Sequence, residues 1–256
     1  MTLGQAAVLG IVQGLTEFLP VSSTAHLVIV QNLFRLKGPI LLVFDVVVHL
    51  GTLASLLVYF GKNFFAREIE RPKHILWLVI LATIPTGIIG FLLKDWMEEY
   101  FNSLSITVIT LLLNSLILWS TRWIPGRAGK EISHWLDAVW IGIAQGISIL
   151  PGISRSGATI STALWLRIKA EDAAWFSFLI AIPAILGATV VVLPESLRFF
   201  SIETWPILAT GFIAAFFSGY LAILVLFRVM LRGQFHLFAL YTFVLAIVTS
   251  FFSFSK

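Results

Sequence analysis

Cysteine is absent from this 256-residue chain, and charged residues are scarce, at 12% of the total. Without cysteine the chain forms no disulfide and offers no thiolate to a metal. Soluble domains contain about 25% charged residues, so the low charged fraction argues against a soluble protein. The formal net charge of +4 is small. In a membrane protein, such a charge indicates loops with more basic than acidic residues and contact with anionic lipid. It gives no reason to expect nucleic acid as a partner.

The chain is instead rich in hydrophobic residues. They make up 59% of the chain, and its mean hydropathy is +0.97. Apolar runs of about 20 residues can cross the hydrocarbon core of a bilayer as helices. We therefore predict an all-α polytopic membrane protein with a single integral-membrane domain over residues 1–256. The six full spans that the pattern predicts lie at about 40–60, 75–93, 104–121, 175–193, 206–227 and 237–254.

Two further apolar segments are each interrupted by proline, at Pro20 within residues 3–34 and at Pro151 within residues 137–165. Proline removes a backbone donor and disfavours helix in the residue before it. Each arm of about 10–15 residues measures roughly 15–22 Å as a helix, which is short for a core of about 30 Å. A re-entrant helical hairpin fits these lengths, and a single helix kinked at Pro20 is the alternative.

The two broken segments are similar in sequence. Gly10-Ile-Val-Gln-Gly14 is echoed by Gly142-Ile-Ala-Gln-Gly146, and both are followed by Leu-Pro and a run of hydroxyl residues. The chain therefore divides into repeat one, about residues 1–123, and repeat two, about residues 135–256. If the broken segments are re-entrant, three spans separate them, and the repeats are inverted in the membrane. Inverted repeats with broken helices place a binding site near the bilayer midplane.

The distribution of basic residues agrees with this topology. With re-entrant segments, the basic loops at 61–74, 122–130, 167–169 and 228–232 all lie on one side of the membrane. Cytoplasmic loops carry an excess of Lys and Arg. We therefore predict that both termini, and the opening of the site, lie on the outer side.

Polar residues of the first break have several interpretations. Gln13 and Glu17 share a helical face, and a carboxylate at bilayer depth usually has a partner or a function. A structural Glu17, satisfied by neighbouring helices, is the alternative. Ser22, Ser23 and Thr24 are candidates for a helix N-cap as well as for catalysis. His26 follows Ser23 by about one turn, a spacing that suits a nucleophile with its base, or a nucleophilic histidine.

The second break carries Arg155 between Ser154 and Ser156, with Thr159 one turn further on. A guanidinium binds phosphate oxygens bidentately, and hydroxyls with free N–H groups at a helix start add to an anion site. The alternatives are an arginine that reaches the membrane interface or one that pairs with Glu17. Elsewhere, Asp45 and His49 are spaced like a metal pair on a helix, but a structural hydrogen bond between Asp45 and His49 is the simpler interpretation.

Together the two breaks predict one asymmetric site. A carboxylate and a phosphate clamp suggest metal-assisted phosphoryl transfer, with a divalent cation between Glu17 and phosphate oxygens. Membrane-embedded phosphate sites suggest a lipid phosphate as the substrate. The alternative from another class is a transporter or lipid flippase that uses the same anion site. A purely structural subunit leaves Glu17 and Arg155 unexplained.

The motifs resemble those of the bacterial undecaprenyl-pyrophosphate phosphatase family, the bacitracin-resistance type. The resemblance extends over the whole chain and rests on four sequence stretches: Gln13-x-x-x-Glu17, Pro20-Val-Ser-Ser-Thr-Ala-His26, Phe44-Asp-Val-Val-Val-His-Leu-Gly51 and Pro151-Gly-Ile-Ser-Arg-Ser-Gly-Ala-Thr159. The family allows Glu or Gln at the first motif position, and this chain has Gln13. Glu17 is then the only carboxylate of the motif.

The resemblance implies removal of the terminal phosphate of undecaprenyl pyrophosphate, which recycles the lipid carrier for peptidoglycan synthesis and confers bacitracin resistance. It also implies Mg²⁺ or Ca²⁺, the bacterial inner membrane, a site open to the outer face, and homodimers. Glu17 would bind metal or act as base, and Ser23 or His26 would attack; we favour Ser23 with His26 assisting. The residues expected to hold the substrate are Gln13, Ser22, Thr24, Ser154, Arg155, Ser156 and Thr159.

Overall fold

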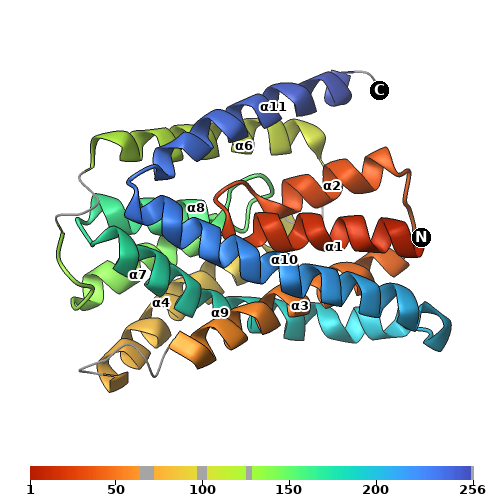
Figure 1. Cartoon of the computed structure of the whole chain (residues 1–256), viewed down its shortest axis with the longest axis horizontal. Coiled ribbons are helices and arrows are strands. Elements are labelled where there is room, and N and C mark those ends of the chain that lie inside the picture. The colour runs from red at the N-terminus through yellow and green to blue at the C-terminus, as the bar shows by residue number, and fades with distance from the viewer. Residues whose placement is uncertain (64–71, 97–102, 125–128, 255–256) are drawn as a thin grey trace.

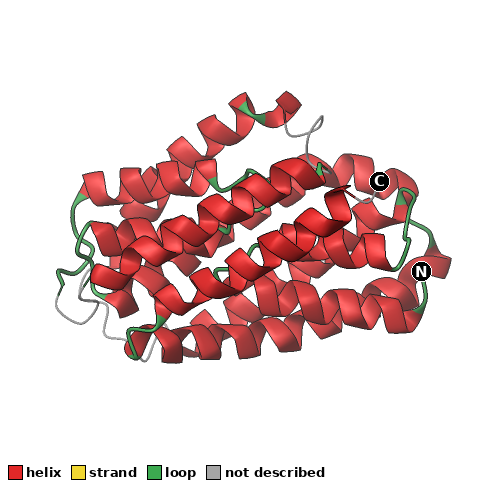
Figure 2. Cartoon of the chain, turned by 90° about the horizontal axis from the view of Figure 1, so that it is seen from above, coloured by secondary structure: helices red, strands yellow, loops and turns green. Residues whose placement is uncertain are grey.

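A computed structural model describes residues 1–63, 72–96, 103–124 and 129–254. These residues form helices joined by short loops, and the only β-type pairing among them is an isolated bridge between Lys130 and Ile168. The helices run along the long axis of the molecule, with most loops at its two ends (Figures 1 and 2). The α-helices are α1 (Leu3–Phe18), α2 (Ser23–Leu33), α3 (Ile40–Asn63), α4 (Pro72–Leu92), α6 (Leu104–Ser120), α7 (Trp135–Ile147), α8 (Arg155–Trp165), α9 (Ala170–Ser196), α10 (Trp205–Leu231) and α11 (Phe238–Phe254). Short 3₁₀ turns cover Thr121–Trp123, Leu197–Phe199, Ile202–Thr204 and Phe235–Leu237.

The predicted all-α class is confirmed, and five helical segments among the described residues are long and apolar enough to span a bilayer. They are Ile40–Gly61, Lys73–Leu92, Leu104–Trp123, Ala170–Phe199 and Ile202–Leu231. The sixth predicted span is α11, an apolar helix of 17 residues. Large apolar side chains such as Phe91, Phe217 and Phe251 are mostly exposed, as expected for a surface in contact with lipid. The chain is therefore a multi-pass membrane protein.

The first broken segment is a helical hairpin. Helix α1 ends at Phe18, before Pro20, and α2 begins at Ser23 with Ser22 as its N-cap. Figure 1 shows α2 running back alongside α1, and Val30 of α2 packs in the same cluster as Met1. The alternative of one helix kinked at Pro20 is therefore wrong.

The second broken segment is also a hairpin, formed by α7 and α8. Lys130, just before α7, forms an ion pair with Asp137 and a backbone bridge with Ile168. The start of α7 and the end of α8 therefore lie together, and the turn at Pro151 lies at the opposite end. Gly152 has a φ of 101°, a left-handed conformation that glycine adopts without steric cost.

Each hairpin packs against a long helix from the other half of the chain. Helix α1 lies along α10, and α7 lies along α4. A Cβ built on Gly10 would lie 2.5 Å from the carbonyl oxygen of Gly211, and one on Gly142 would overlap the backbone of Ala82. The repeated glycines thus allow close contact between helices, and this packing brings the tips of the two hairpins together inside the bundle.

Part of the basic-loop prediction falls on residues 64–71 and 125–128, which include Arg67, Arg71 and Arg127 and lie outside the described residues. Among the described loops, the one at Lys130 lies beside the one at 167–169. Two backbone hydrogen bonds join them: the N–H of Lys130 donates to the carbonyl of Arg167, and the N–H of Lys169 donates to the carbonyl of Lys130. Two of the predicted basic loops are therefore adjacent at one end of the bundle.

Candidate active site

The two hairpin tips bring two helix N-termini to one cavity. Helix α2 begins at Ser23 with Ser22 as N-cap, and α8 begins at Arg155 with Ser154 as N-cap. Ser22 accepts from the N–H of Ala25, and Ser154 accepts from that of Gly157. The first N–H groups of a helix lack partners within the helix and carry partial positive charge. Two such ends facing one space form an anion-binding site.

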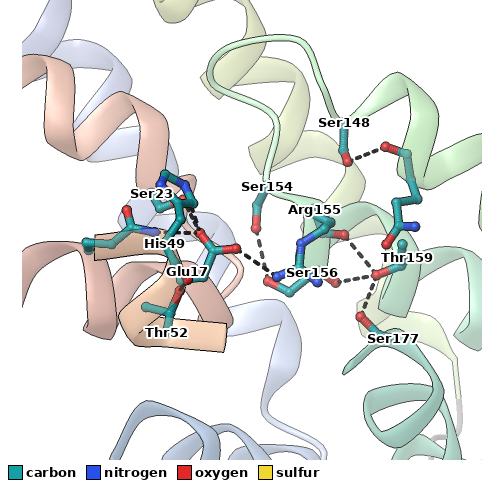
Figure 3. A network of polar contacts seen from close by, with 12 residues as sticks. Glu17, Ser23, His49, Thr52, Ser148, Ser154, Arg155, Ser156, Thr159 and Ser177 are labelled. Atoms are coloured by element: carbon teal, nitrogen blue, oxygen red, sulfur yellow. Dashed lines mark hydrogen bonds and ion pairs between the residues drawn. The ribbon is translucent and has the colours of Figure 1, made fainter. Parts of the chain in front are cut away.

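Glu17, at the end of α1, connects the two hairpins. Its Oε2 accepts from Ser23 Oγ at 2.7 Å and from Gln13 Nε2 at 3.0 Å. Its Oε1 accepts from Arg155 Nη2 at 2.8 Å. Figure 3 shows the Glu17 and Arg155 side chains extending toward each other from different hairpins. The alternative in which Arg155 pairs with Glu17 is therefore confirmed for this state.

The ion pair is largely withdrawn from solvent: the side chains of Glu17 and Arg155 are 7% and 14% exposed. Removing two charges from water is costly, and mutual attraction offsets that cost only with good geometry and further hydrogen bonds. Glu17 has those bonds, but Nη1 of Arg155 is buried with no partner. Buried donors are almost always satisfied, so this nitrogen is available to an anion in the site.

The polar cavity at the tips has a volume of about 120 Å³. It is lined by Glu17, Ser22, Ser23, Thr24, His49, Ser148, Ile153, Ser154 and Arg155. A larger cavity of about 910 Å³ lies between α4 and α9, but apart from Lys73 and Thr83 its lining is apolar. The smaller cavity contains the groups that can bind an anion and transfer a proton, so the chemistry belongs there.

Ser22 adopts a φ of 67°, in the left-handed region that non-glycine residues rarely occupy. Such conformations cost on the order of 1–3 kcal/mol and persist where the surroundings enforce them, often at functional sites. Here the conformation turns the chain sharply before Ser23, so that the hydroxyl of Ser23 meets Glu17. A hydroxyl hydrogen-bonded to a carboxylate is the arrangement of a nucleophile and its base.

Comparison with known proteins identifies the family of the chain. The sequence matches the family model described as bacitracin resistance protein BacA over residues 6–248. The chain belongs to this family. A protein named undecaprenyl-diphosphatase from Carboxydothermus hydrogenoformans is 45% identical over 249 residues, which is 95% of this chain and 94% of the relative. Proteins of the same name from Desulforapulum autotrophicum and Korarchaeum cryptofilum are 38% and 36% identical, over 97% and 96% of this chain and 98% of each relative.

In this member of the BacA family, some of the predicted substrate-binding residues line the polar cavity and others lie behind it. Ser22, Thr24, Ser154 and Arg155 line the polar cavity. Gln13 lies behind Glu17 and touches the cavity only through it. Ser156 bonds Ser154 at 3.1 Å, and Thr159 bonds Ser177 of α9 at 2.6 Å. Gln13, Ser156 and Thr159 therefore support the cavity from outside, and they do not line it.

The structure shows no hydrogen bond between His26 and Ser23, so the assistance of Ser23 by His26 stays a prediction. Both ring nitrogens of His26 are engaged elsewhere: Nδ1 donates to the carbonyl of Ser22 at 2.7 Å, and Nε2 bonds the hydroxyl of Tyr241 on α11 at 2.7 Å. The His26 and Tyr241 rings are nearly parallel, at 4°. The spacing of one turn suggested a contact with Ser23, but the ring bonds Tyr241, a partner far along the chain.

His49, rather than His26, is the imidazole that faces the cavity. Its Nε2 lies 3.8 Å from Glu17 Oε2, and its Nδ1 donates to the backbone carbonyl of Asp45 at 2.7 Å. The predicted structural hydrogen bond between Asp45 and His49 is therefore present, through the Asp45 backbone, while the Asp45 carboxylate accepts from Gln31. The sequence signal for His49 was its place in the Phe44–Gly51 motif, but no sequence pattern identified α1 as the neighbour of α3.

The donor set allows one kind of metal site. Across the described residues there is no group of three His, Cys, Asp or Glu side chains that could share an ion, and Glu17 is the one carboxylate that lines the polar cavity. Mg²⁺ in phosphoryl-transfer sites is usually bound through one or two carboxylates together with substrate phosphates and waters. The oxygens of Glu17 and of the neighbouring hydroxyls fit such a shared site, which the substrate would complete.

Proposed function

We propose that this chain hydrolyses undecaprenyl pyrophosphate to undecaprenyl phosphate and inorganic phosphate, as the names of its relatives indicate for them. The observation that carries the proposal is the contact of Ser23 and Arg155 with the same carboxylate, Glu17, where two helix N-termini meet. The product is the carrier that peptidoglycan synthesis reuses, and rapid conversion of the pyrophosphate would confer bacitracin resistance.

Substrate binding changes the partner of Arg155. The pyrophosphate oxygens compete with Glu17 for the guanidinium, and the unpartnered Nη1 gives them a second donor. The N–H groups at the starts of α2 and α8 contribute further positive potential. Glu17, released from its ion pair but still bonded to Ser23, then becomes the base at the site.

The reaction proceeds in two displacements. Ser23 Oγ attacks the terminal phosphorus while its proton passes to Glu17 Oε2, and the bond to the lipid monophosphate breaks. Water then attacks the phosphoserine, Glu17 returns its proton to the departing Ser23 oxygen, and inorganic phosphate leaves with both protons of the water. Arg155 stabilises the negative charge on the transferring phosphoryl group. A divalent cation, Mg²⁺ or Ca²⁺, held by Glu17 together with the phosphate oxygens of the substrate, would neutralise further charge.

The membrane arrangement that supports this function has two inverted repeats, about residues 1–123 and 135–256, in one integral-membrane domain. Each repeat has a re-entrant hairpin and three spans, with α11 as the shortest span. The reciprocal packing of α1 on α10 and of α7 on α4 supports this reading. With the basic loops inside, both termini and the opening of the cavity lie on the outer face of the inner membrane. The protein would act there as a homodimer, which light scattering of the purified protein tests.

Phosphate release tests the proposal. Purified protein in detergent should release inorganic phosphate from undecaprenyl pyrophosphate, lose this activity in EDTA, and regain it with Mg²⁺ or Ca²⁺. Ser23→Ala should abolish turnover while the substrate still binds. Robust turnover by Ser23→Ala would show that water or another residue attacks, and no release by folded wild-type protein would refute the hydrolase assignment.

A lipid flippase is the second candidate, because two hairpins that meet near the middle of the bundle are also a transporter arrangement. A flippase would move the lipid without releasing phosphate. The contact between Ser23 and Glu17 favours hydrolysis, since binding alone has no use for a base beside a hydroxyl. Transfer of a fluorescent lipid phosphate across vesicles, measured with Ser23→Ala, separates the two activities.

A further inference from the structure

Asn114 is a fully buried amide in the middle of the apolar helix α6, outside both hairpins. An amide at this depth is costly unless it is hydrogen-bonded. A polar residue in a helix can bond a carbonyl of its own preceding turn, as Thr107 does with Ser103. Asn114 bonds instead across to the two hairpins, so its position in α6 serves something beyond its own helix.

Each half of the Asn114 amide reaches one hairpin tip. Its Nδ2 donates to the carbonyl oxygen of Pro20, 3.1 Å away in the first break. Its Oδ1 accepts from the backbone N–H of Ser154, 3.0 Å away at the start of α8. Pro20 lies three residues before Ser23, and Ser154 directly precedes Arg155. One side chain thus connects the backbone segments that carry the nucleophile and the guanidinium.

Helix α6 is a firm support for this link. One turn before Asn114, the hydroxyl of Thr110 donates to the carbonyl of Pro151 in the second break. On the other side, Ser115 donates to the carbonyl of Ala239 at 3.0 Å, which fixes α6 to α11. A Cβ on Gly157 would lie 3.0 Å from Asn114 Oδ1, so the amide has little room to move.

We infer that Asn114 is a positioning residue that sets the spacing between the two hairpin tips, and thereby between Ser23 and Arg155. The inference rests on the proposed function, because it concerns the same site. An amide is suited to this role because it presents one donor and one acceptor on a rigid plane, which matches one carbonyl and one N–H. Asn114 does not line the cavity, so it acts through the hairpins and not on the substrate.

Loss of the link should affect turnover more than binding. Arg155 and the start of α8 remain to bind the pyrophosphate, but Ser23 is no longer held in line with the phosphorus. A misplacement of about 1 Å can cost about 100-fold in rate. We therefore expect Asn114→Leu, which keeps the branched shape of the side chain and removes both bonds, to lower kcat by roughly 10–100-fold with KM changed less than about threefold.

Ser115→Ala is the matched control, since it removes a buried hydrogen bond from the next residue of the same helix without touching either hairpin. Its kcat should stay within about twofold of wild type. Asn114→Asp is the second variant: it keeps the acceptor for Ser154 and loses the donor to Pro20, so its kcat should fall between those of wild type and Asn114→Leu. Thermal unfolding in detergent checks that each variant is folded.

A second measurement does not depend on catalysis. Because the chain lacks cysteine, spin labels at Ile11→Cys and Ile147→Cys, both exposed positions on the two hairpins, report the distance between them. Asn114→Leu should broaden this distance distribution, and Ser115→Ala should not. Wild-type kcat in folded Asn114→Leu, an equal loss in Ser115→Ala, or an unchanged distance distribution would overturn the inference. If the wild type released no phosphate, the proposed function would fail, and the distance measurement would still test the link.

Discussion

Replacing Glu17 with glutamine removes one negative charge while it keeps the shape of the side chain. In the structure, this carboxylate accepts hydrogen bonds from the side chains of Ser23, Gln13 and Arg155, with donor–acceptor distances of 2.7, 3.0 and 2.8 Å. Ser23 and Arg155 bond different oxygens of Glu17, so the single carbonyl oxygen of glutamine keeps only one of these two bonds. The amide also cannot take a proton from Ser23. General-base catalysis contributes about 10²–10⁴-fold, so kcat should fall by about that factor.

The same substitution should strengthen the binding of a pyrophosphate. In the wild type, an anion must displace Glu17 from Arg155, and a hydrogen bond to a charged group is worth about 1.5–3 kcal/mol. At about 1.4 kcal/mol per tenfold change in Kd, removing this competition should tighten binding by about 10–100-fold. The variant also leaves Arg155 without a counter-ion, so its free energy of unfolding should fall by up to about 3–5 kcal/mol.

Calorimetric titration with methylene diphosphonate in EDTA measures this binding without turnover and without metal. Glu195→Gln, at an exposed position in α9, makes the same charge change away from the site and should leave both Kd and kcat unchanged. If Glu17→Gln bound the analogue more weakly than wild type in EDTA, Glu17 would be a direct contact of the anion, and the competition for Arg155 would be refuted.

Three further outcomes follow from the geometry. Arg155→Lys keeps the charge but not the planar pair of donors, so kcat/KM for phosphate release should fall by about 10–100-fold; retention of wild-type kcat/KM would contradict a bidentate role. His49→Gln, at the cavity, should lower kcat about tenfold or more, whereas His26→Gln, which loses the bond to Tyr241, should lower the unfolding temperature and leave kcat nearly unchanged; the reverse pattern would return His26 to the reaction. Gly142→Val should push α7 away from α4 and cost about 1–3 kcal/mol of stability or more, measured by thermal unfolding, while Gly187→Val, which meets open space, should not.

Much of the site could be predicted because its signals are local. Proline breaks a helix and serine caps one, so Pro20 with Ser22 and Pro151 with Ser154 located both turns. The shared Gly-Ile-x-Gln-Gly motif identified the two halves as related, and the burial of Glu17 and Arg155 in apolar sequence indicated that each needed a partner. The ion pair between them followed from these facts as one alternative, and the structure contains it.

The partners of several site residues could not be predicted, because they depend on contacts between distant parts of the chain. The ring of His26 is held by Tyr241, and the cavity is completed by His49 on a separate helix. Asn114 shows no motif in the sequence, because its partners are two backbone groups in different hairpins. A helical spacing fixes the face on which a residue lies, but it does not specify which helix covers that face.

Phosphate release by wild type and Arg155→Ala, reconstituted in liposomes that contain undecaprenyl pyrophosphate, tests the central claim most directly. That claim is that a group from the second hairpin completes a hydrolytic site on the first. We predict that the wild type forms equal amounts of inorganic phosphate and undecaprenyl monophosphate with Mg²⁺ or Ca²⁺, and that Arg155→Ala, folded and inserted, forms at least about 100-fold less. Comparable release by both proteins would contradict the account.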